Sequence, residues 1–275
     1  MVSMDWSGQT RSLFLDQETV SCTASNLKMI PAAFYIPKDN PSKPNGEDAY
    51  FISESEQTIG VADGVGGWAM RGIDAGVYAR ELMSNVATSV RDEKKKNGVV
   101  NPKRALTEAF RFTVSQGSTT ACIITLQGEF LQCANVGDSK FVLIRDGKVV
   151  FSSPIQTNAF NSPYQLGKES DSPSVAAEFK CSVEAWDVIV AGTDGLFDNV
   201  HETELETMVF QGLLVGTKPE LLAKEIANFA LEKATDPFAC TPFQIEAMQA
   251  GYEYLGGKYD DITVVVALIK PLEWI

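Results

Sequence analysis

Acidic residues stand where several short apolar segments of this chain begin or end. Five places share this pattern: Glu47 and Asp48 in NGEDAYFI, Asp63 in IGVADGVGGW, Asp138 in ANVGDSKF, Asp194 in VIVAGTDGLFDN, and Asp260 and Asp261 in KYDDITVVV. Strand ends that are distant in sequence can meet in space, and carboxylates gathered there repel one another if left bare. Mg2+ and Mn2+ prefer oxygen ligands and remove that repulsion. The pattern therefore predicts a metal site.

The glycines of DGVGG support the same interpretation. Gly64 lets the backbone turn sharply after the strand that ends at Asp63, and it lets a main-chain carbonyl approach an ion. A single Asp-Gly pair is most often only a turn, and Asp146 with Gly147 is predicted to be one. The evidence for a metal site is the joint occurrence of all these acidic positions.

Short strands and helices are predicted around the acidic positions. Strands are expected from Tyr50 to Ile52 and from Thr58 to Ala62. A helix follows, with Asp74 as its N-cap, and a second helix has Asn101 as N-cap and Pro102 at its first position.

The rest of the chain is predicted to hold more strands, a long loop and more helices. STTACIITL, EFLQCANV, KFVLIRDG and KVVFSS are four strands in quick succession, and DVIVAG and DITVVVALI are two more. The polar segment 153–178 is predicted to be a long surface loop, and 202–213 and 219–233 are predicted helices. Strands and helices occur in blocks, which favours an α+β domain of packed antiparallel sheets with flanking helices. Residues 1–24 have no clear periodicity and are predicted to be a lead-in to a domain that spans 25–275.

Composition narrows the choice of partners. The chain has 275 residues, 44% of them hydrophobic, and a net charge of -13. Nucleic-acid binding requires a surplus of Lys and Arg, so we expect no nucleic-acid partner. A polybasic membrane anchor is disfavoured for the same reason. The sequence contains no run of 18 apolar residues, so no membrane span is predicted.

The cysteines indicate the redox compartment. There are five, widely spaced and without a CxxC pair, which favours free thiols in a reducing, intracellular compartment. The N-terminus has no signal-peptide pattern. We therefore expect a cytoplasmic location by default, and a plastid or mitochondrion if an upstream transit peptide is missing.

Several other catalytic classes lack their sequence signatures here. No cysteine is followed six positions later by the arginine that cysteine phosphatases need. GxSxG, GxxxxGK[ST] and GxGxxG are also absent, which argues against serine hydrolases, P-loop enzymes and Rossmann dehydrogenases.

The acidic motifs, taken together and in order, resemble the type 2C protein phosphatases, the metal-dependent PPM family. GEDA, VADGVGGW, GSTTACI, ANVGDS, VAGTDGLFDN and DDITVVV all have counterparts there, and the resemblance covers roughly residues 30 to 270. Within that family the chain is similar to a branch of plants and fungi with many organellar members. The resemblance implies two packed antiparallel β-sheets flanked by helices, in a four-layer αββα arrangement.

The resemblance also implies a role for each acidic residue. Asp63 would bridge two ions, Mg2+ or Mn2+, and Gly64 would give its carbonyl to one of them. Asp194 and Asp260 would bind the other ion, and Glu47 would reach a metal through water. Behind these first ligands lie Asp48 and Asp261, while Asp138 and Asp198 resemble the residues that hold a weaker third ion.

The activity implied is hydrolysis of phosphoserine and phosphothreonine in a phosphorylated protein substrate by a monomeric enzyme. A water that bridges the metals is the nucleophile, so no phosphoenzyme forms. Two positions depart from the family. Val65 stands where many members have a histidine, and Lys43 stands where many have an arginine that binds phosphate, with Arg71 and Lys258 as other candidates. The alternative function is a catalytically degenerate phosphatase-like module that binds a partner.

Overall fold

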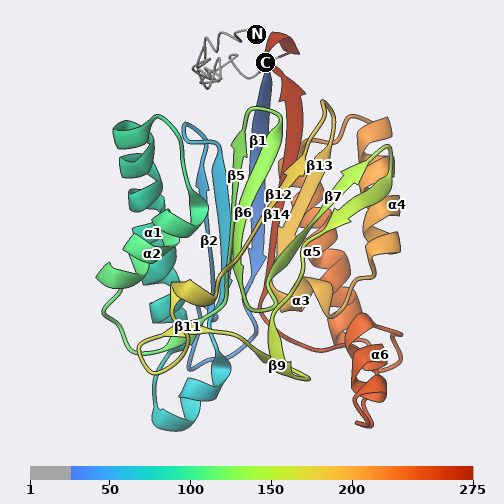
Figure 1. Cartoon of the computed structure of the whole chain (residues 1–275). Coiled ribbons are helices and arrows are strands. Elements are labelled where there is room, and N and C mark those ends of the chain that lie inside the picture. Colours follow the sequence, from blue (N-terminus) through green and yellow to red (C-terminus); the bar gives the residue numbers. More distant parts are fainter. Residues whose placement is uncertain (1–25, 275) are drawn as a thin grey trace, which may run out of the picture.

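The central strands of this protein are apolar on both faces because they lie between two other layers. The computed structural model describes residues 26–274, so the predicted lead-in over 1–24 lies outside the described residues. Two five-stranded sheets pack face to face, and helices cover the outer face of each (Figure 1). The predicted α+β class and its αββα layering are confirmed.

Each sheet is antiparallel throughout. One has the order β1 (Leu27–Ile36), β14 (Ile262–Pro271), β13 (Val188–Gly192), β7 (Lys140–Arg145) and β8 (Lys148–Ser152). The other has the order β12 (Ala177–Ser182), β6 (Phe130–Val136), β5 (Ala121–Gln127), β3 (Thr58–Asp63) and β2 (Asp48–Ser53). Two small pairs are β4 (Ser118–Thr119) with β11 (Leu166–Gly167), and β9 (Thr157–Ala159) with β10 (Ser162–Pro163).

The helices cover the two outer faces. The α1 (Ala75–Asn97) and α2 (Pro102–Phe112) helices pack on the sheet that contains β2 and β3, while α4 (Glu202–Leu214) and α5 (Pro219–Thr235) pack on the other. The predicted caps are present: Asp74 accepts from the Gly76 amide at 2.9 Å, and Asn101 accepts from the Arg104 amide at 2.8 Å. The remaining helical segments are η1 (Gly66–Arg71), η2 (Pro173–Val175), α3 (Asp194–Phe197), α6 (Pro242–Gln249) and η3 (Leu272–Trp274).

Strand β14 shows why three core layers can form. Its alternate residues Ile262, Val264 and Val266 face the helix layer, whereas Val265 and Ala267 face the other sheet. Side chains of a strand alternate between its two faces, and here both faces are buried, so the strand is apolar without interruption from Val264 to Ile269.

The prediction of one long surface loop over 153–178 is wrong in part. That segment contains β9, β10, β11 and η2, and β12 begins in it at Ala177. The sequence AEFKCS alternates because β12 is an edge strand, with Phe179 and Cys181 packed against the core between the sheets. Short edge strands are apolar on one face only, so their sequence resembles that of a polar loop. The predicted turn at Asp146 and Gly147 is confirmed, with φ of 50° and 74°.

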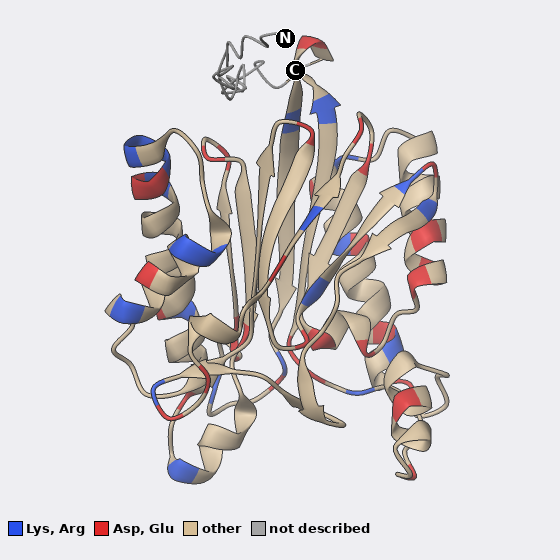
Figure 2. Ribbon diagram, viewed as in Figure 1, with Lys and Arg blue, Asp and Glu red and all other residues tan. Residues whose placement is uncertain are grey.

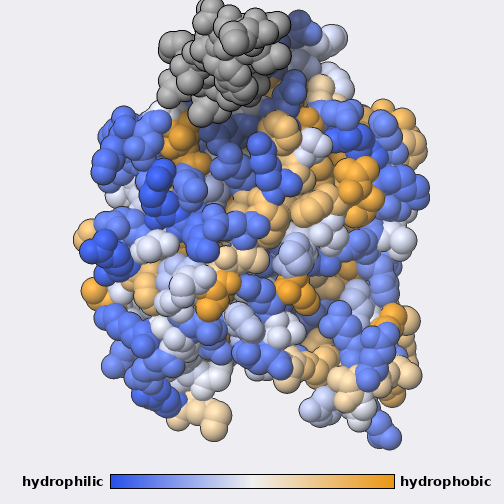
Figure 3. All heavy atoms as spheres, in the orientation of Figure 1, coloured by the Kyte–Doolittle hydropathy of each residue, from blue (hydrophilic) through white to orange (hydrophobic). Residues whose placement is uncertain are grey.

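The surface is mostly hydrophilic with scattered apolar patches, and its lower edge is hollowed between the lobe that carries η1 and the lobe that carries α6 (Figure 3). Acidic segments gather at the lower ends of the central strands, beside this hollow (Figure 2). No helix among residues 26–274 has both the length and the apolar character needed to cross a bilayer.

The packing of α1 on its sheet predicts a large cost for shortening Leu82. This side chain is fully buried, so Leu82→Ala should lower the free energy of unfolding by about 2–5 kcal/mol. Leu221→Ala is the matched control, since Leu221 is 50% exposed on α5 and should lose less than about 1 kcal/mol. Urea unfolding of both variants measures the difference, and equal losses would contradict this account of the core.

Candidate metal centre

Strand pairing brings the predicted acidic residues to one end of the sandwich. Asp48 begins β2 and Asp63 ends β3, and the antiparallel register places the two directly opposite each other. In the other sheet Gly192 pairs with Val264, so Asp194, which follows β13, lies beside the segment that precedes β14. Asp260 and Asp261 belong to that segment. Four parts of the chain therefore meet at the lower ends of the strands.

A cavity of about 460 Å³ opens at this meeting point. Most of the predicted site residues line it: Lys43, Glu47, Asp63, Gly64, Asp138, Asp194, Asp260 and Asp261. Asp48 is not in the lining but buried behind it, and Asp198 lines a smaller adjoining cavity of about 70 Å³ together with Asp138 and Asp194. The structure thus brings together Lys43, Gly64 and the acidic residues that the resemblance selected.

The carboxylates in this cavity repel one another. Burial raises the pKa of Asp63 well above its usual range, and the charges of Asp194 and Asp48 raise it further. The pKa of Asp138 is raised to about 7 by burial and by the charge of Asp194. Its Oδ1 atom is buried and has no hydrogen-bond partner among residues 26–274. A cluster of buried, mutually repelling carboxylates is stabilised when a cation binds it.

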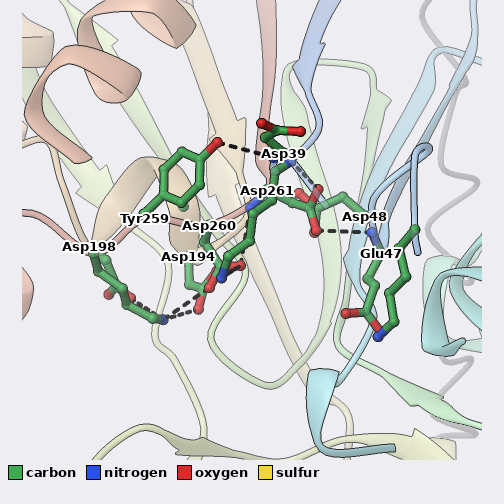
Figure 4. Close-up of polar contacts among 12 residues, drawn as sticks. Asp39, Glu47, Asp48, Asp194, Asp198, Tyr259, Asp260 and Asp261 are labelled. Atoms are coloured by element: carbon green, nitrogen blue, oxygen red, sulfur yellow. Dashed lines mark hydrogen bonds and ion pairs between the residues drawn. The ribbon is translucent and has the colours of Figure 1, made fainter. Parts of the chain in front are cut away.

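Lys258 already supplies one positive charge. Its Nζ forms ion pairs with Asp194, with Asp198 at 2.6 Å and with Asp260 at 3.8 Å (Figure 4). Burial alone would raise the pKa of Asp194, but the ammonium outweighs that effect and holds it below its usual value. Asp198 pairs with the same ammonium, which lowers its pKa. Burial and the charge of Asp194 outweigh this effect, so the pKa of Asp198 is raised to about 8.

The oxygen donors fit a hard divalent cation, although some side chains must adjust to bind one. Within the described residues no three acidic, histidine or cysteine side chains converge closely enough to hold an ion as they stand, and the Lys258 ammonium lies among the nearest of them. The donors available are carboxylates and the Gly64 carbonyl, which is the ligand chemistry of Mg2+ and Mn2+.

Asp48 is held from behind by hydroxyl groups of the other sheet. Its Oδ2 accepts hydrogen bonds from the Thr193 and Thr263 hydroxyls, both at 2.7 Å. Thr193 directly follows β13 and Thr263 lies in β14, whereas Asp48 begins β2, so these bonds join the two sheets at the site.

Asp261 holds the Lys38–Glu47 loop, which carries Lys43, in place through hydrogen bonds. It accepts from the Tyr35 hydroxyl at 2.9 Å and from the amides of Lys38 at 2.8 Å and Glu47 at 2.9 Å. Sequence reasoning missed Tyr35, because an isolated tyrosine in an apolar strand carries no signal of such a contact. Burial, with the charges of Asp48 and Asp261, raises the pKa of the Tyr35 hydroxyl far above its usual value.

Close packing explains the glycine after Asp63. A Cβ atom on Gly64 would lie 2.6 Å from the Glu47 carbonyl oxygen and 2.9 Å from the Ala75 backbone. The Gly64 amide also donates to the Glu47 carbonyl at 3.1 Å. The predicted reasons for this glycine were a sharp turn and the approach of its carbonyl to an ion, and the structure adds the close approach of two backbone segments.

The candidate phosphate-binding residues differ in position. Lys43 forms an ion pair with Glu47 at 2.7 Å inside the cavity. Lys38, which sequence reasoning did not single out, also lines the cavity and lies 3.6 Å from Asp260. Arg71 is not among the lining residues: it pairs with Glu169 at 2.7 Å and lies over the Trp68 ring.

The only histidine of the chain lies outside the cavity lining. His201 is the N-cap of α4, and its amide donates to the Glu204 carboxylate at 2.9 Å. Val65 does line the cavity, so the position that is histidine in many family members cannot supply a proton here.

The pKa of Asp138 predicts how stability depends on pH without metal. An unfolded aspartate titrates near about 3.9, well below the folded value of about 7. Between these values the folded state binds more protons, so the free energy of unfolding should fall as the pH rises from about 4 to about 7. Urea unfolding in EDTA checks this. Asp138→Asn should show a shallower fall, and an unchanged slope would contradict the assignment.

Comparison with known proteins agrees with this geometry. The sequence profile of the family described as "Protein phosphatase 2C" matches residues 47–156. The chain is 47% identical over 245 residues to "Probable protein phosphatase 2C 55" of Arabidopsis thaliana. The aligned region covers 88% of this chain but only 52% of that relative. The chain therefore spans about half the length of this curated relative.

Solved structures share the fold. The X-ray structure of the photosystem II phosphatase PBCP is 32% identical, with a TM-score of 0.80 over 89% of this chain and 100% of that one. The catalytic domain of the serine/threonine phosphatase PstP, in complex with two manganese ions, is 20% identical with a TM-score of 0.61 over 89% and 99%; at that identity it shows the fold alone. With the ordered acidic motifs, the αββα layers and these identities in agreement, the chain belongs to the protein phosphatase 2C family.

Proposed function

We propose that this domain is a metal-dependent protein serine/threonine phosphatase. The observation that carries the proposal is the convergence of Asp63, Asp194 and Asp260 on one cavity from three separate parts of the chain. All three lie at strand ends. The negative charges of Asp194 and Asp260 both raise the pKa of Asp63. A cation-binding phosphatase centre accounts for this arrangement, whereas a partner-binding module would not require it.

The residues of this cavity would hold two divalent cations, Mg2+ or Mn2+. Asp63 would bind both, with the Gly64 carbonyl on one of them, Asp194 and Asp260 on the other, and Glu47 acting through water. PstP, which shares the fold, was solved in complex with two manganese ions, and we propose the same number here. When bound, such ions lower the pKa of a water nucleophile and offset charge on the phosphoryl group.

The protein's own residues orient the substrate and the ligands. Lys43 lies in the cavity with its side chain only 13% exposed, so its ammonium can bind a phosphoryl oxygen as a point charge. Asp48 and Asp261 hold the β2 end and the Lys38–Glu47 loop through the hydrogen bonds described above. Because the Val65 side chain has no ionisable proton, we expect water to protonate the leaving oxygen.

The substrate we propose is a phosphorylated serine or threonine in a protein, and the domain would act as a monomer. We also propose a reducing compartment, because the four cysteines within the described residues are free thiols. Similarity to a photosystem II phosphatase favours a plastid among the locations expected from the sequence.

Replacing the shared ligand tests the proposal directly. Asp63→Asn should lower Mn2+-dependent hydrolysis of an aryl phosphate and of phosphopeptides on the order of 10³-fold, because it removes a charge needed to hold both ions. EDTA should abolish the wild-type rate and Mn2+ should restore it. Asp146→Asn is the matched control, since Asp146 is an exposed turn residue that asparagine can replace. If wild type and Asp63→Asn show the same rate, the partner-binding alternative replaces this proposal.

Replacing the candidate phosphate-binding lysine tests substrate binding. Lys43→Met should raise KM for an aryl phosphate by about 10-fold or more, since one charge-assisted contact is lost. Lys43→Arg should keep part of that affinity. Arg71→Met should leave KM unchanged, because Arg71 is paired with Glu169 outside the cavity lining. A larger effect from Arg71→Met than from Lys43→Met would reassign the phosphate contact.

A further inference from the structure

Lys258 is unusual because it stands inside the acidic cluster and not at its rim. Its side chain is only 15% exposed, and its Nζ pairs with both Asp194 and Asp198. The Phe243 ring lies on another side of the ammonium, with its centroid 5.0 Å away. The Asp198 carboxylate, which resembles a ligand of a third metal ion, is thus already engaged by a cation that belongs to the chain.

The backbone of Lys258 is fixed in place. Its amide donates to the Asn199 side chain at 2.9 Å, and its carbonyl accepts from the same side chain at 2.8 Å. Asn199 is fully buried and follows Asp198 directly. The lysine and one of its carboxylate partners are therefore tied together through neighbouring residues.

The glycine before Lys258 makes this placement possible. A Cβ atom on Gly257 would lie 2.0 Å from the Lys233 carbonyl oxygen and 2.5 Å from Ala234, both at the end of α5. The Gly257 amide donates to the Asp236 carbonyl at 3.0 Å. Only a residue without a side chain lets the segment pass so close to the helix, so the approach of Lys258 to the cluster is built into the fold.

We propose that the Lys258 ammonium takes the place of a third metal ion, so that this centre binds two divalent cations and not three. The inference rests on the proposed phosphatase function. A divalent ion between Asp194 and Asp198 would have to displace the ammonium or lie against it, and like charges at such short range repel strongly. The ion pair uses Oδ2 of Asp194, so the ammonium does not occupy its other carboxylate oxygen.

Lys258 is thus a positioning residue. Its charge offsets the repulsion of Asp194 and Asp198 at all times, whereas a weakly bound ion would do so only at high metal concentration. Asp138, which would share such an ion with Asp198, keeps a buried Oδ1 without a hydrogen-bond partner among the described residues, so it remains available as a ligand if the lysine is removed.

Counting bound ions tests the proposal without measuring activity. Mn2+ titration of the whole chain, followed by calorimetry and by the electron paramagnetic resonance signal of free Mn2+, should give two ions for wild type and for Lys258→Arg. Lys258→Met should bind a third, and Lys258→Met combined with Asp198→Asn should return to two. Three ions in wild type, or two in Lys258→Met, overturns the proposal.

Thermal unfolding gives a second readout. In EDTA, Lys258→Met should have a lower Tm than wild type and Lys258→Arg, because its carboxylates lose their cation, and Mn2+ should raise its Tm more than that of wild type. Lys38→Met is the control, since Lys38 is 42% exposed and 3.6 Å from Asp260; it should keep the wild-type ion count. A Lys258→Met variant with an unchanged ion count and only a raised KM for phosphate would instead show that Lys258 binds substrate.

If Lys258→Met does not fold, crystals of wild type grown with Mn2+ decide the question. An anomalous peak between Asp194 and Asp198 overturns the proposal, and two peaks elsewhere in the cavity with Lys258 in place support it. Failure of the proposed phosphatase function gives a different result. Wild type would then be no more active than Asp63→Asn, while the number of bound ions would still change from two to three in Lys258→Met.

Discussion

Repulsion between buried carboxylates is the constraint on which the rest of this structure depends. Asp48 and Asp63 face each other across one sheet, and Asp194 and Asp260 approach from the other. Burial and the neighbouring negative charges raise the pKa of Asp48 and of Asp63. The Lys258 ammonium instead holds the pKa of Asp194 below its usual value. A fold that places these groups together is less stable than one that separates them, so the arrangement implies a cation as part of the working molecule.

The packing of the two β-sheets between helices supplies the rigidity that this arrangement requires. Strands β3, β13 and β14, which end or begin at the site, are buried on both faces, with one core layer between the sheets and another under each pair of helices. Hydroxyls of Thr193 and Thr263 hold Asp48, and the Lys38–Glu47 loop is tied to Asp261. The acidic groups therefore cannot relieve their repulsion by moving apart without breaking hydrogen bonds or separating the sheets.

The lysines near the centre have different tasks. Lys43 and Lys38 each pair with one acidic partner in the cavity. Lys258 has two close carboxylate partners and an aromatic ring beside its ammonium. An ammonium with so many partners is poorly placed to bind a substrate phosphate, which separates its role from that of Lys43.

The sequence by itself determined the type and order of the main strands and helices and the acidic character of their ends. Continuous apolar runs such as DITVVVALI predict buried strands, and the caps Asp74 and Asn101 predict helix starts, because these signals are local. Family resemblance then indicated which residues form the candidate site. Edge strand β12 and the contact of Tyr35 with Asp261 were not predictable, since a half-exposed strand and a single hydroxyl carry little local signal.

Only the tertiary structure decided which charges meet. Lys258 and Asp198 are sixty residues apart, and nothing in either segment indicates that they pair. Their contact depends on a glycine that passes close to α5 and on a buried asparagine that holds the lysine backbone. Local sequence determines which groups are available, but distances between distant segments arise from packing, and electrostatic energy depends on those distances.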